Sequence, residues 1–104
     1  EIPNKTVLET EHSLAFHDIN PAAPVHVLVI PKGPYVTFDH FAAEASAEEI
    51  TDFHRACAQV CTLLDLKQGY RAITNAGRDG MQEVPHYHLH ILAGRTMGPL
   101  IGQL

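Results

Sequence analysis

Three histidines alternate with apolar residues near the end of the chain, in the segment His86-Tyr87-His88-Leu89-His90. Successive side chains of a β-strand point to opposite faces, so this spacing predicts three imidazoles on one face and apolar side chains on the other. The charge of an imidazole changes near neutral pH, and either ring nitrogen can attack, donate or accept. This segment is therefore the first candidate for a reactive site.

Two interpretations of the histidine row involve no covalent chemistry. In the first, the histidines bind a metal. Zinc binds imidazole nitrogen at about 2.0–2.1 Å, but a strand that rises about 3.3 Å per residue places the Cα atoms of His86 and His90 roughly 13 Å apart. Only two of the three could therefore bind the same ion, and they would need a further ligand from a distant part of the sequence. His26 is the candidate for that ligand. In the second, the imidazoles are hydrogen-bonded side chains that fill one face of a sheet.

Nucleophilic catalysis is the interpretation that uses all three histidines. A neutral imidazole attacks phosphorus and leaves again, which divides one displacement into two easier steps. The attacking nitrogen must be unprotonated, so the other ring nitrogen must donate to a fixed acceptor such as a backbone carbonyl. His88, in the middle, is best placed to attack. His86 and His90 can then orient it, bind phosphoryl oxygens or pass a proton.

Composition limits the kind of protein this is. The 104 residues are 45% hydrophobic and 18% charged, which is typical of one globular domain over residues 1–104. The formal net charge of -5 argues against a general nucleic-acid partner, which would need a basic face. No apolar run approaches the roughly 20 residues that cross a bilayer, so no membrane partner is expected.

The cysteine content indicates the compartment. Cys57 and Cys61 are the only two cysteines, too few for a disulfide framework, so we expect a reducing, cytoplasmic setting. Both fall in a helical pattern where they would serve as small buried hydrophobes. A metal pair completed by a histidine is the alternative.

The order of the predicted elements indicates an α+β domain, an antiparallel sheet with one long helix packed on it. Ser46 and Glu49 form a capping box, and an apolar stripe from Ile50 to Leu64 follows it. Strands are predicted over residues 5–11, 14–17, 25–30, 70–75 and 83–92. The apolar tail at residues 97–101 predicts a homodimer, because such a surface usually packs on a partner.

Residues 75–82 form a loop rich in glycine and amide groups that precedes the histidine segment. Loops of this kind suit phosphate binding through backbone amides, although Gly77 and Gly80 are equally suited to plain turns. The chain contains no Walker loop and no dinucleotide-binding fingerprint.

The motifs together resemble the histidine triad (HIT) superfamily. His86-x-His88-x-His90 matches its defining motif, and residues 16–32 are similar to the segment that lines its nucleoside pocket. Residues 69–71, 80–84 and 92–95, with Asn75, resemble its Hint branch. The resemblance implies a homodimeric α+β fold that binds purine mononucleotides. It also implies hydrolysis of AMP or GMP phosphoramidates, including nucleotidyl-lysine and aminoacyl adenylates, through a nucleotidyl-histidine intermediate.

The resemblance also implies site residues. His88 corresponds to the nucleophile, His86 and His90 to its neighbours in the triad, and His26 to the histidine behind the site. Asp18 corresponds to the ribose-hydroxyl acceptor, although it could instead cap the turn before Asn20. The nucleotide-binding residues implied are Phe16, His17, Asp18, Ile19, Asn75, Met81, Gln82 and Glu83. No metal or cofactor is expected, because imidazoles and backbone amides can stabilise the phosphoryl oxygens.

Two positions depart from many animal relatives, which carry glycine and serine where this chain has Met81 and Glu83. A serine hydroxyl donates toward phosphate, and an ionised carboxylate cannot. Glu83 could face away, pair with Arg78, or attract a cationic leaving amine.

A purine nucleoside phosphoramidate hydrolase is the function that the sequence favours. Hydrolysis of dinucleoside polyphosphates by the same triad is the enzyme alternative. A nucleotide-binding interaction protein with incidental hydrolysis is the alternative from another class.

Overall fold

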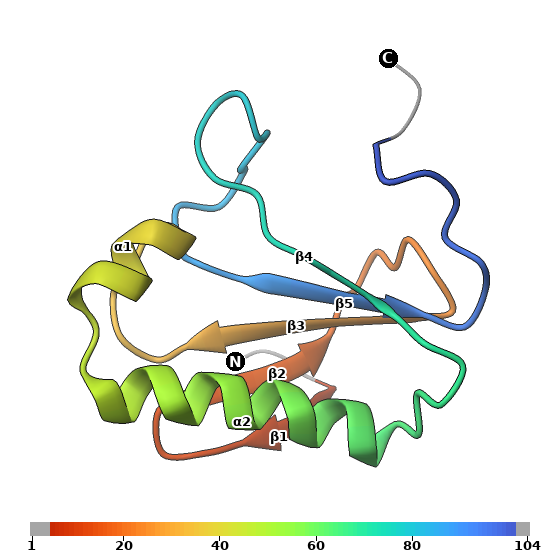
Figure 1. Ribbon diagram of the computed structural model, residues 1–104, viewed down its shortest axis with the longest axis horizontal. Helices are drawn as coiled ribbons and strands as arrows, with labels where there is room; N and C mark the ends of the chain where they lie inside the picture. The colour runs from red at the N-terminus through yellow and green to blue at the C-terminus, as the bar shows by residue number, and fades with distance from the viewer. Residues whose placement is uncertain (1–4, 102–104) are drawn as a thin grey trace.

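The computed structural model describes residues 5–101, which form one five-stranded antiparallel sheet and two helices (Figure 1). The elements in chain order are β1 (Thr6–Glu9), β2 (Ser13–His17), β3 (Val25–Pro31), α1 (Phe38–Glu44), α2 (Ala47–Leu63), β4 (Arg71–Ile73) and β5 (Leu89–Ala93). The strand order in the sheet is β1-β2-β3-β5-β4. The predicted α+β class is therefore confirmed.

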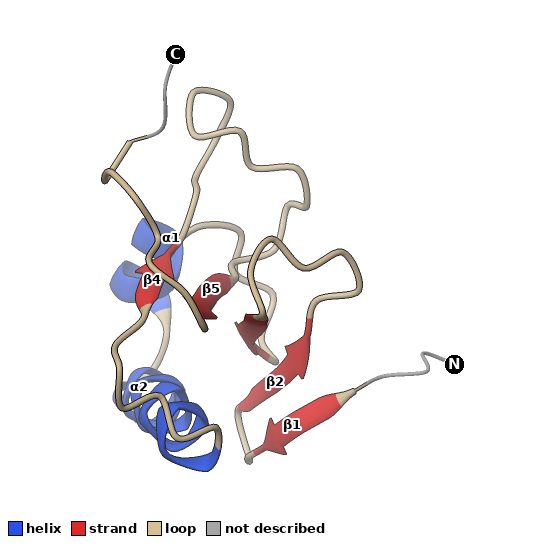
Figure 2. Cartoon of the chain, turned by 90° about the vertical axis from the view of Figure 1, so that its right-hand side faces the viewer, coloured by secondary structure: helices blue, strands red, loops and turns tan. Residues whose placement is uncertain are grey.

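The hydrophobic core lies between the sheet and α2. Both helices lie on the same side of the sheet in Figure 2, and α2 packs mainly against β1, β2 and β3. Buried side chains from α2 and from the strands interleave in this layer. They include Ala15, Val27, Val29, Phe53, Ala56, Val60 and Ile91. Neither helix within residues 5–101 is long and apolar enough to cross a membrane.

Three aromatic rings close one end of this core. Phe41 of α1, Phe53 of α2 and Tyr87 lie with ring centroids 5.1–5.2 Å apart, a separation at which aromatic pairs attract one another. Tyr87 is only 3% exposed, and Ile91 is buried beside it. The apolar residues between the histidines therefore face the core, as their spacing predicted.

The start and the buried stripe of α2 agree with the sequence. The Ser46 hydroxyl accepts a hydrogen bond from the Glu49 amide at 3.1 Å, and a Glu49 carboxylate oxygen accepts one from the Ser46 amide at 2.9 Å. Cys57 and Cys61 are half-buried free thiols, and burial raises the pKa of Cys57 to about 12. Within residues 5–101 neither joins a group of potential metal ligands. Both cysteines therefore serve as packed side chains of the helix.

The structure differs from the predicted elements at two places. The strand predicted over residues 83–92 is wrong in its first part, because β5 begins only at Leu89. Pro85 has no amide to donate to a sheet, and the amide of Tyr87 donates to the carbonyl of Tyr35 rather than to a strand. Helix α1 was not predicted, because its seven residues are too few to show a helical period. Burial of Phe41 holds it in place.

The face of the sheet opposite α2 presents a row of side chains that crosses four strands. Phe16 pairs with Leu28, Leu28 with His90, and His90 with Ile73. Directly paired residues point to the same side of a sheet. His90 therefore stands on a face of the sheet that no helix among the described elements covers (Figure 2).

Asp52 ties α2 to the hairpin of β1 and β2. One of its carboxylate oxygens accepts hydrogen bonds from Thr10 Oγ1 at 2.6 Å and from Ser13 Oγ at 2.7 Å. Burial alone would raise the pKa of Asp52, but these hydrogen bonds outweigh it and lower the pKa.

Because the folded-state pKa of Asp52 is lowered, its carboxylate stabilises the fold above the unfolded-state pKa, and this contribution is lost as pH falls through the folded-state pKa. We predict that Asp52→Asn costs about 1 kcal/mol of unfolding free energy at neutral pH and flattens the loss of stability in acid. Urea unfolding at pH 7 and in acid measures both effects. The same change at Asp79, whose side chain is 95% exposed, should alter neither; equal acid sensitivity in Asp52→Asn and the unmodified protein would contradict the prediction.

Candidate functional site

The histidine segment is brought together by a turn and a short strand rather than by one long strand. Only His90 lies in β5, whereas His86 and His88 lie in the irregular segment before it. The ring centroids of His88 and His90 are 5.0 Å apart, and those of His90 and His26 are 5.1 Å apart. Three of the four predicted catalytic histidines therefore form one continuous group of rings.

His88 is held in a single tautomer by the backbone before it. Its Nδ1 lies 2.7 Å from the carbonyl oxygen of His86. A carbonyl oxygen can only accept, so Nδ1 carries a proton, and in the neutral ring Nε2 therefore has the lone pair. The carbonyl of His88 accepts a hydrogen bond from Thr74 Oγ1 at 2.8 Å, which fixes the backbone from the side of β4. The result is an oriented imidazole whose neutral form has its lone pair on Nε2.

His86 contributes through both its backbone and its ring. Its carbonyl is the acceptor for His88, and its Nε2 donates to the carbonyl of Pro31 at 2.9 Å. Because Pro31 ends β3, this bond fastens the irregular segment to the sheet. The ring of His86 is thus engaged with β3.

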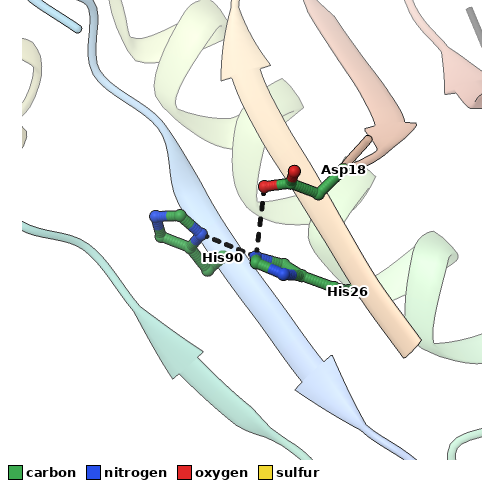
Figure 3. A group of neighbouring side chains, drawn as sticks. All are labelled: Asp18, His26 and His90. Atoms are coloured by element: carbon green, nitrogen blue, oxygen red, sulfur yellow. Dashed lines mark hydrogen bonds and ion pairs between the residues drawn. The ribbon is translucent and has the colours of Figure 1, made fainter. Parts of the chain in front are cut away.

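A buried chain of hydrogen bonds lies behind His90 (Figure 3). His26, on β3, is 7% exposed, and its Nε2 lies 2.9 Å from Nδ1 of His90 and 3.5 Å from a carboxylate oxygen of Asp18. The amide of Ala22 donates to the other ring nitrogen of His26 at 3.0 Å. Burial lowers the pKa of His90, helped by the neighbouring His88 and His26 and opposed by Asp18.

The group Asp18, His26 and His90 has the composition of a metal site, since one ligand atom of each lies within 4.8 Å of the others. However, the two nitrogens that would face the ion are hydrogen-bonded to each other. One of them must carry a proton, and a protonated nitrogen cannot bind a metal. This arrangement fits an ordered proton better than an ion.

Asp18 has two contacts, one through each carboxylate oxygen. One carboxylate oxygen accepts a hydrogen bond from the amide of Asn20 at 2.8 Å, which is the turn cap considered from the sequence. The other faces His26. A carboxylate has about four acceptor positions, so these two contacts do not use all of them.

The remaining residues of the predicted nucleotide pocket divide between the two faces of the sheet. Phe16 shares the face of His90, and Ile19, in the loop after β2, is 84% exposed. His17 pairs with Val27, a core residue, so it points away from the face that carries Phe16. The structure therefore separates His17 from the histidine group.

Gln82 holds the loop before the histidines. Its amide nitrogen donates to the carbonyls of Val36 at 2.6 Å and Val84 at 3.0 Å, and its amide oxygen accepts from the amide of Gly77 at 3.0 Å. Both ends of this amide group are thus bonded to backbone. Met81, directly before Gln82, is exposed and has a positive φ of 61°.

Glu83 lies on the surface of the same loop. Arg78, one partner considered for it, instead has its ion pair with Asp79 at 3.4 Å. Asn75 is half-buried and follows directly after Thr74, which holds His88.

Sequence reasoning missed the groups that fix the rings: Thr74, the amide of Ala22, and the carbonyls of His86 and Pro31. Three of these four are backbone groups, which nearly every residue possesses. No residue type or spacing could have identified these three.

Known proteins resemble this chain in sequence and in structure. The model of the HIT domain family matches residues 1–97. An uncharacterized 13.2 kDa HIT-like protein of Azospirillum brasilense is 56% identical over 102 residues, which cover 97% of this chain and 84% of the relative. A HIT family hydrolase from Clostridium thermocellum aligns with a TM-score of 0.86 at 42% identity, over 96% of this chain and 87% of that one. A histidine triad nucleotide-binding protein from Candida albicans aligns with a TM-score of 0.78 at 26% identity, over 99% and 78% of the two chains.

The hydrogen bond from Thr74 to the carbonyl of His88 can be tested without any ligand. We predict that Thr74→Val, which leaves that half-buried carbonyl without its donor, lowers the unfolding free energy by about 1 kcal/mol and speeds hydrogen exchange at the backbone amides around His88. Thr74→Ser keeps the hydroxyl and should behave like the unmodified protein. Equal exchange rates in the two variants would show that the hydroxyl does not hold His88.

Proposed function

Because the chain belongs to the HIT family, we propose that it is a purine nucleoside phosphoramidate hydrolase. The observation that carries the proposal is the tautomer of His88. Its Nδ1 donates to the carbonyl of His86, so in the neutral ring the lone pair is on Nε2, as a nucleophile toward phosphorus requires. The alignments with a HIT family hydrolase and a histidine triad nucleotide-binding protein support a hydrolytic, nucleotide-linked role.

The open face of the sheet supplies surfaces that suit a nucleoside. A flat purine would gain burial and stacking against Phe16, with Ile19 as the opposite wall. The carboxylate of Asp18, which keeps unused acceptor positions, would accept the ribose hydroxyls. A nucleotide bound in this order would place its phosphate next to His90 and His88.

The reaction would proceed in two displacements. Nε2 of His88 attacks the α-phosphorus, a P–N bond forms to the ring, and the bond to the leaving amine breaks. Water then attacks the nucleotidyl-His88 intermediate, which releases the mononucleotide and restores the imidazole. The amine gains one proton and the phosphate one hydroxyl, so one water molecule balances the sequence. No metal or cofactor takes part in this scheme.

The other predicted residues enter the proposal according to their contacts. His86 orients the nucleophile through its carbonyl. Asn75, which directly follows Thr74 in the sequence, would contact the phosphate. Gln82 acts on the site through the loop it holds. Met81 and Glu83 belong to the exposed rim, where the leaving amine would pass.

The proposal extends to a homodimer in the cytoplasm. Leu100 and Ile101 are exposed large apolar residues at the end of the described chain, and such surfaces usually pack on a partner. The free thiols fit a reducing compartment.

The nucleophile assignment has a direct test. With an adenosine phosphoramidate as substrate, we predict that His88→Ala lowers kcat by at least about 10³-fold, because no other group can replace the attacking nitrogen. Mass spectrometry of the rapidly quenched unmodified protein should show one added nucleotidyl mass on His88. His54→Ala, the same change at an exposed histidine of α2, is the control. Full turnover by His88→Ala would exclude the mechanism.

The leaving group separates this proposal from its alternatives. We predict that an adenosine phosphoramidate of lysine has a kcat/KM at least about tenfold above that of a diadenosine polyphosphate in a direct competition, as specificity is a ratio of these constants. The opposite preference would indicate a dinucleoside polyphosphate hydrolase. Tight AMP binding with negligible turnover of both would indicate a nucleotide-binding interaction protein.

A further inference from the structure

We propose that Tyr35 and Glu49, which lie outside the predicted site, are positioning residues for His88. The hydrogen bond between their side chains holds the connection between β3 and α1 in place, and the histidine segment is bonded to that connection. The inference rests on the proposed function, because it concerns the geometry of the same nucleophile. Both residues act through the backbone, and neither touches the substrate.

The connection between β3 and α1, residues 32–37, carries part of the segment that leads into β5. The carbonyl of Tyr35 accepts a hydrogen bond from the amide of Tyr87 at 2.8 Å, and the carbonyl of Val36 accepts one from the side-chain amide of Gln82 at 2.6 Å. Figure 1 shows the chain entering β5 beside α1, which directly follows the connection. A shift of the connection would therefore move both acceptors, and with them the segment that holds the histidines.

A single peptide group links the Tyr35 carbonyl to the nucleophile. The amide N–H of Tyr87 and the carbonyl of His86 belong to the same peptide group, which is planar and turns as one unit. On one side this group donates to Tyr35 at 2.8 Å, and on the other it accepts from Nδ1 of His88 at 2.7 Å. The position of the Tyr35 carbonyl therefore sets the direction of the acceptor that orients His88.

Tyr35 is in turn held by Glu49 at the start of α2. Its hydroxyl donates to the Glu49 carboxylate, whose two oxygens lie 2.9 and 3.0 Å away. The nearer oxygen, Oε1, also accepts a hydrogen bond from the amide of Ser46 at 2.9 Å. One carboxylate thus caps α2 and anchors the connection, so the first turn of a 17-residue helix serves as the fixed point.

The ring of Tyr35 lies in a place that the surrounding chain is built to leave open. A Cβ atom at Gly33 would lie 2.6 Å from Cε2 of Tyr35 and 3.1 Å from Oε2 of Glu49, and the first distance is too short for a non-bonded contact. The Tyr35 ring also meets Phe41 and His40 edge-on, with centroids 5.2 and 5.4 Å apart, an arrangement that aromatic pairs prefer. Because the ring is enclosed in this way, fixing its hydroxyl also fixes the backbone that bears it.

The protonation states of the two residues keep this bond intact near neutral pH. The hydrogen bond to Glu49 raises the pKa of Tyr35, helped by partial burial and by the charges of Glu49 and Glu44. The pKa of Glu49 is lowered by the hydrogen bond from the Ser46 amide and next by that from Tyr35. A phenol therefore donates to an ionised carboxylate, and such a charge-assisted bond is stronger than one between neutral groups.

Kinetics with an adenosine phosphoramidate tests the inference. Tyr35→Phe keeps the ring and removes the hydroxyl, so we expect kcat to fall about tenfold, because a small misplacement of a reacting group is costly. KM should stay within about twofold, because the groups that bind the substrate are unchanged. Glu49→Ala should lose as much in kcat. Glu49→Gln keeps an oxygen that can accept from both Ser46 and Tyr35, and it should stay near the unmodified protein.

Two control variants separate positioning from a general loss of stability. Ser46→Ala removes the other half of the capping box, the hydroxyl that accepts from the Glu49 amide; it weakens the helix but leaves the bond from Tyr35 in place. Tyr70→Phe makes the same chemical change at a tyrosine outside the connection. Both should retain kcat. Full activity of Tyr35→Phe, or an equal loss in Ser46→Ala, would overturn the inference.

A readout without substrate keeps this test apart from that of the proposed function. In Tyr35→Phe, we expect the backbone amide of Tyr87 to exchange with solvent about tenfold faster, and ¹⁵N spectra of histidine-labelled protein to show that His88 has lost its single tautomer. A nucleotidyl adduct on His88 with unchanged exchange and kcat in Tyr35→Phe would leave the hydrolase standing and remove only the inference. Faster exchange and a lost tautomer, without an adduct on the unmodified protein, would support the positioning of His88 and refute the reaction scheme.

Discussion

The burial of the Tyr87 ring is the constraint on which the histidine site depends. The ring packs against Phe41 and Phe53, and the amide of the same residue donates to the carbonyl of Tyr35. With its central residue fixed in the core, the segment must turn His86 and His88 outward on either side. The carbonyl of His86 then lies within 2.7 Å of the ring of His88. Core packing, rather than sheet pairing, thus orients the imidazole that we propose as the nucleophile.

Backbone groups order the protons in this cluster. A histidine alone has two neutral tautomers of similar energy, but a carbonyl can only accept and an amide can only donate. The carbonyls of His86 and Pro31 and the amide of Ala22 therefore each fix the tautomer of one ring. Because these atoms belong to the fold, each neutral ring has the same tautomer as long as the fold persists. The ligand would meet a site whose donors and acceptors are already set.

The charge distribution is consistent with local rather than general recognition of an anion. The chain carries a formal net charge of -5, so its overall field does not attract a nucleotide. The guanidinium groups of Arg71 and Arg95 both donate to backbone carbonyls. Arg71 donates to Gly98 and Pro99, and Arg95 donates to Thr96 and Ala22. The proposed phosphoryl contacts accordingly come from imidazoles and amides, which bind through directional hydrogen bonds more than through charge.

The features that sequence alone could determine are those encoded by residue type and short spacing. The capping box of Ser46 and Glu49, the buried stripe of α2, the orientation of Tyr87 toward the core and the α+β class are local patterns, and the structure confirms them. The short helix α1 and the late start of β5 at Leu89 escaped prediction. Both depend on contacts between distant segments, which local propensity does not record.

For the site, sequence could nominate the histidines and Asp18 but could not assign their protons. The contact between His26 and His90 joins residues 64 positions apart, and the group that fixes it is an amide in a surface loop. Every residue except proline has such an amide, so no letter in the sequence distinguishes the one at Ala22. Sequence thus determined which side chains are available. Tertiary structure alone decided which ring nitrogen carries each proton, because that depends on which backbone atom the fold brings within hydrogen-bonding distance.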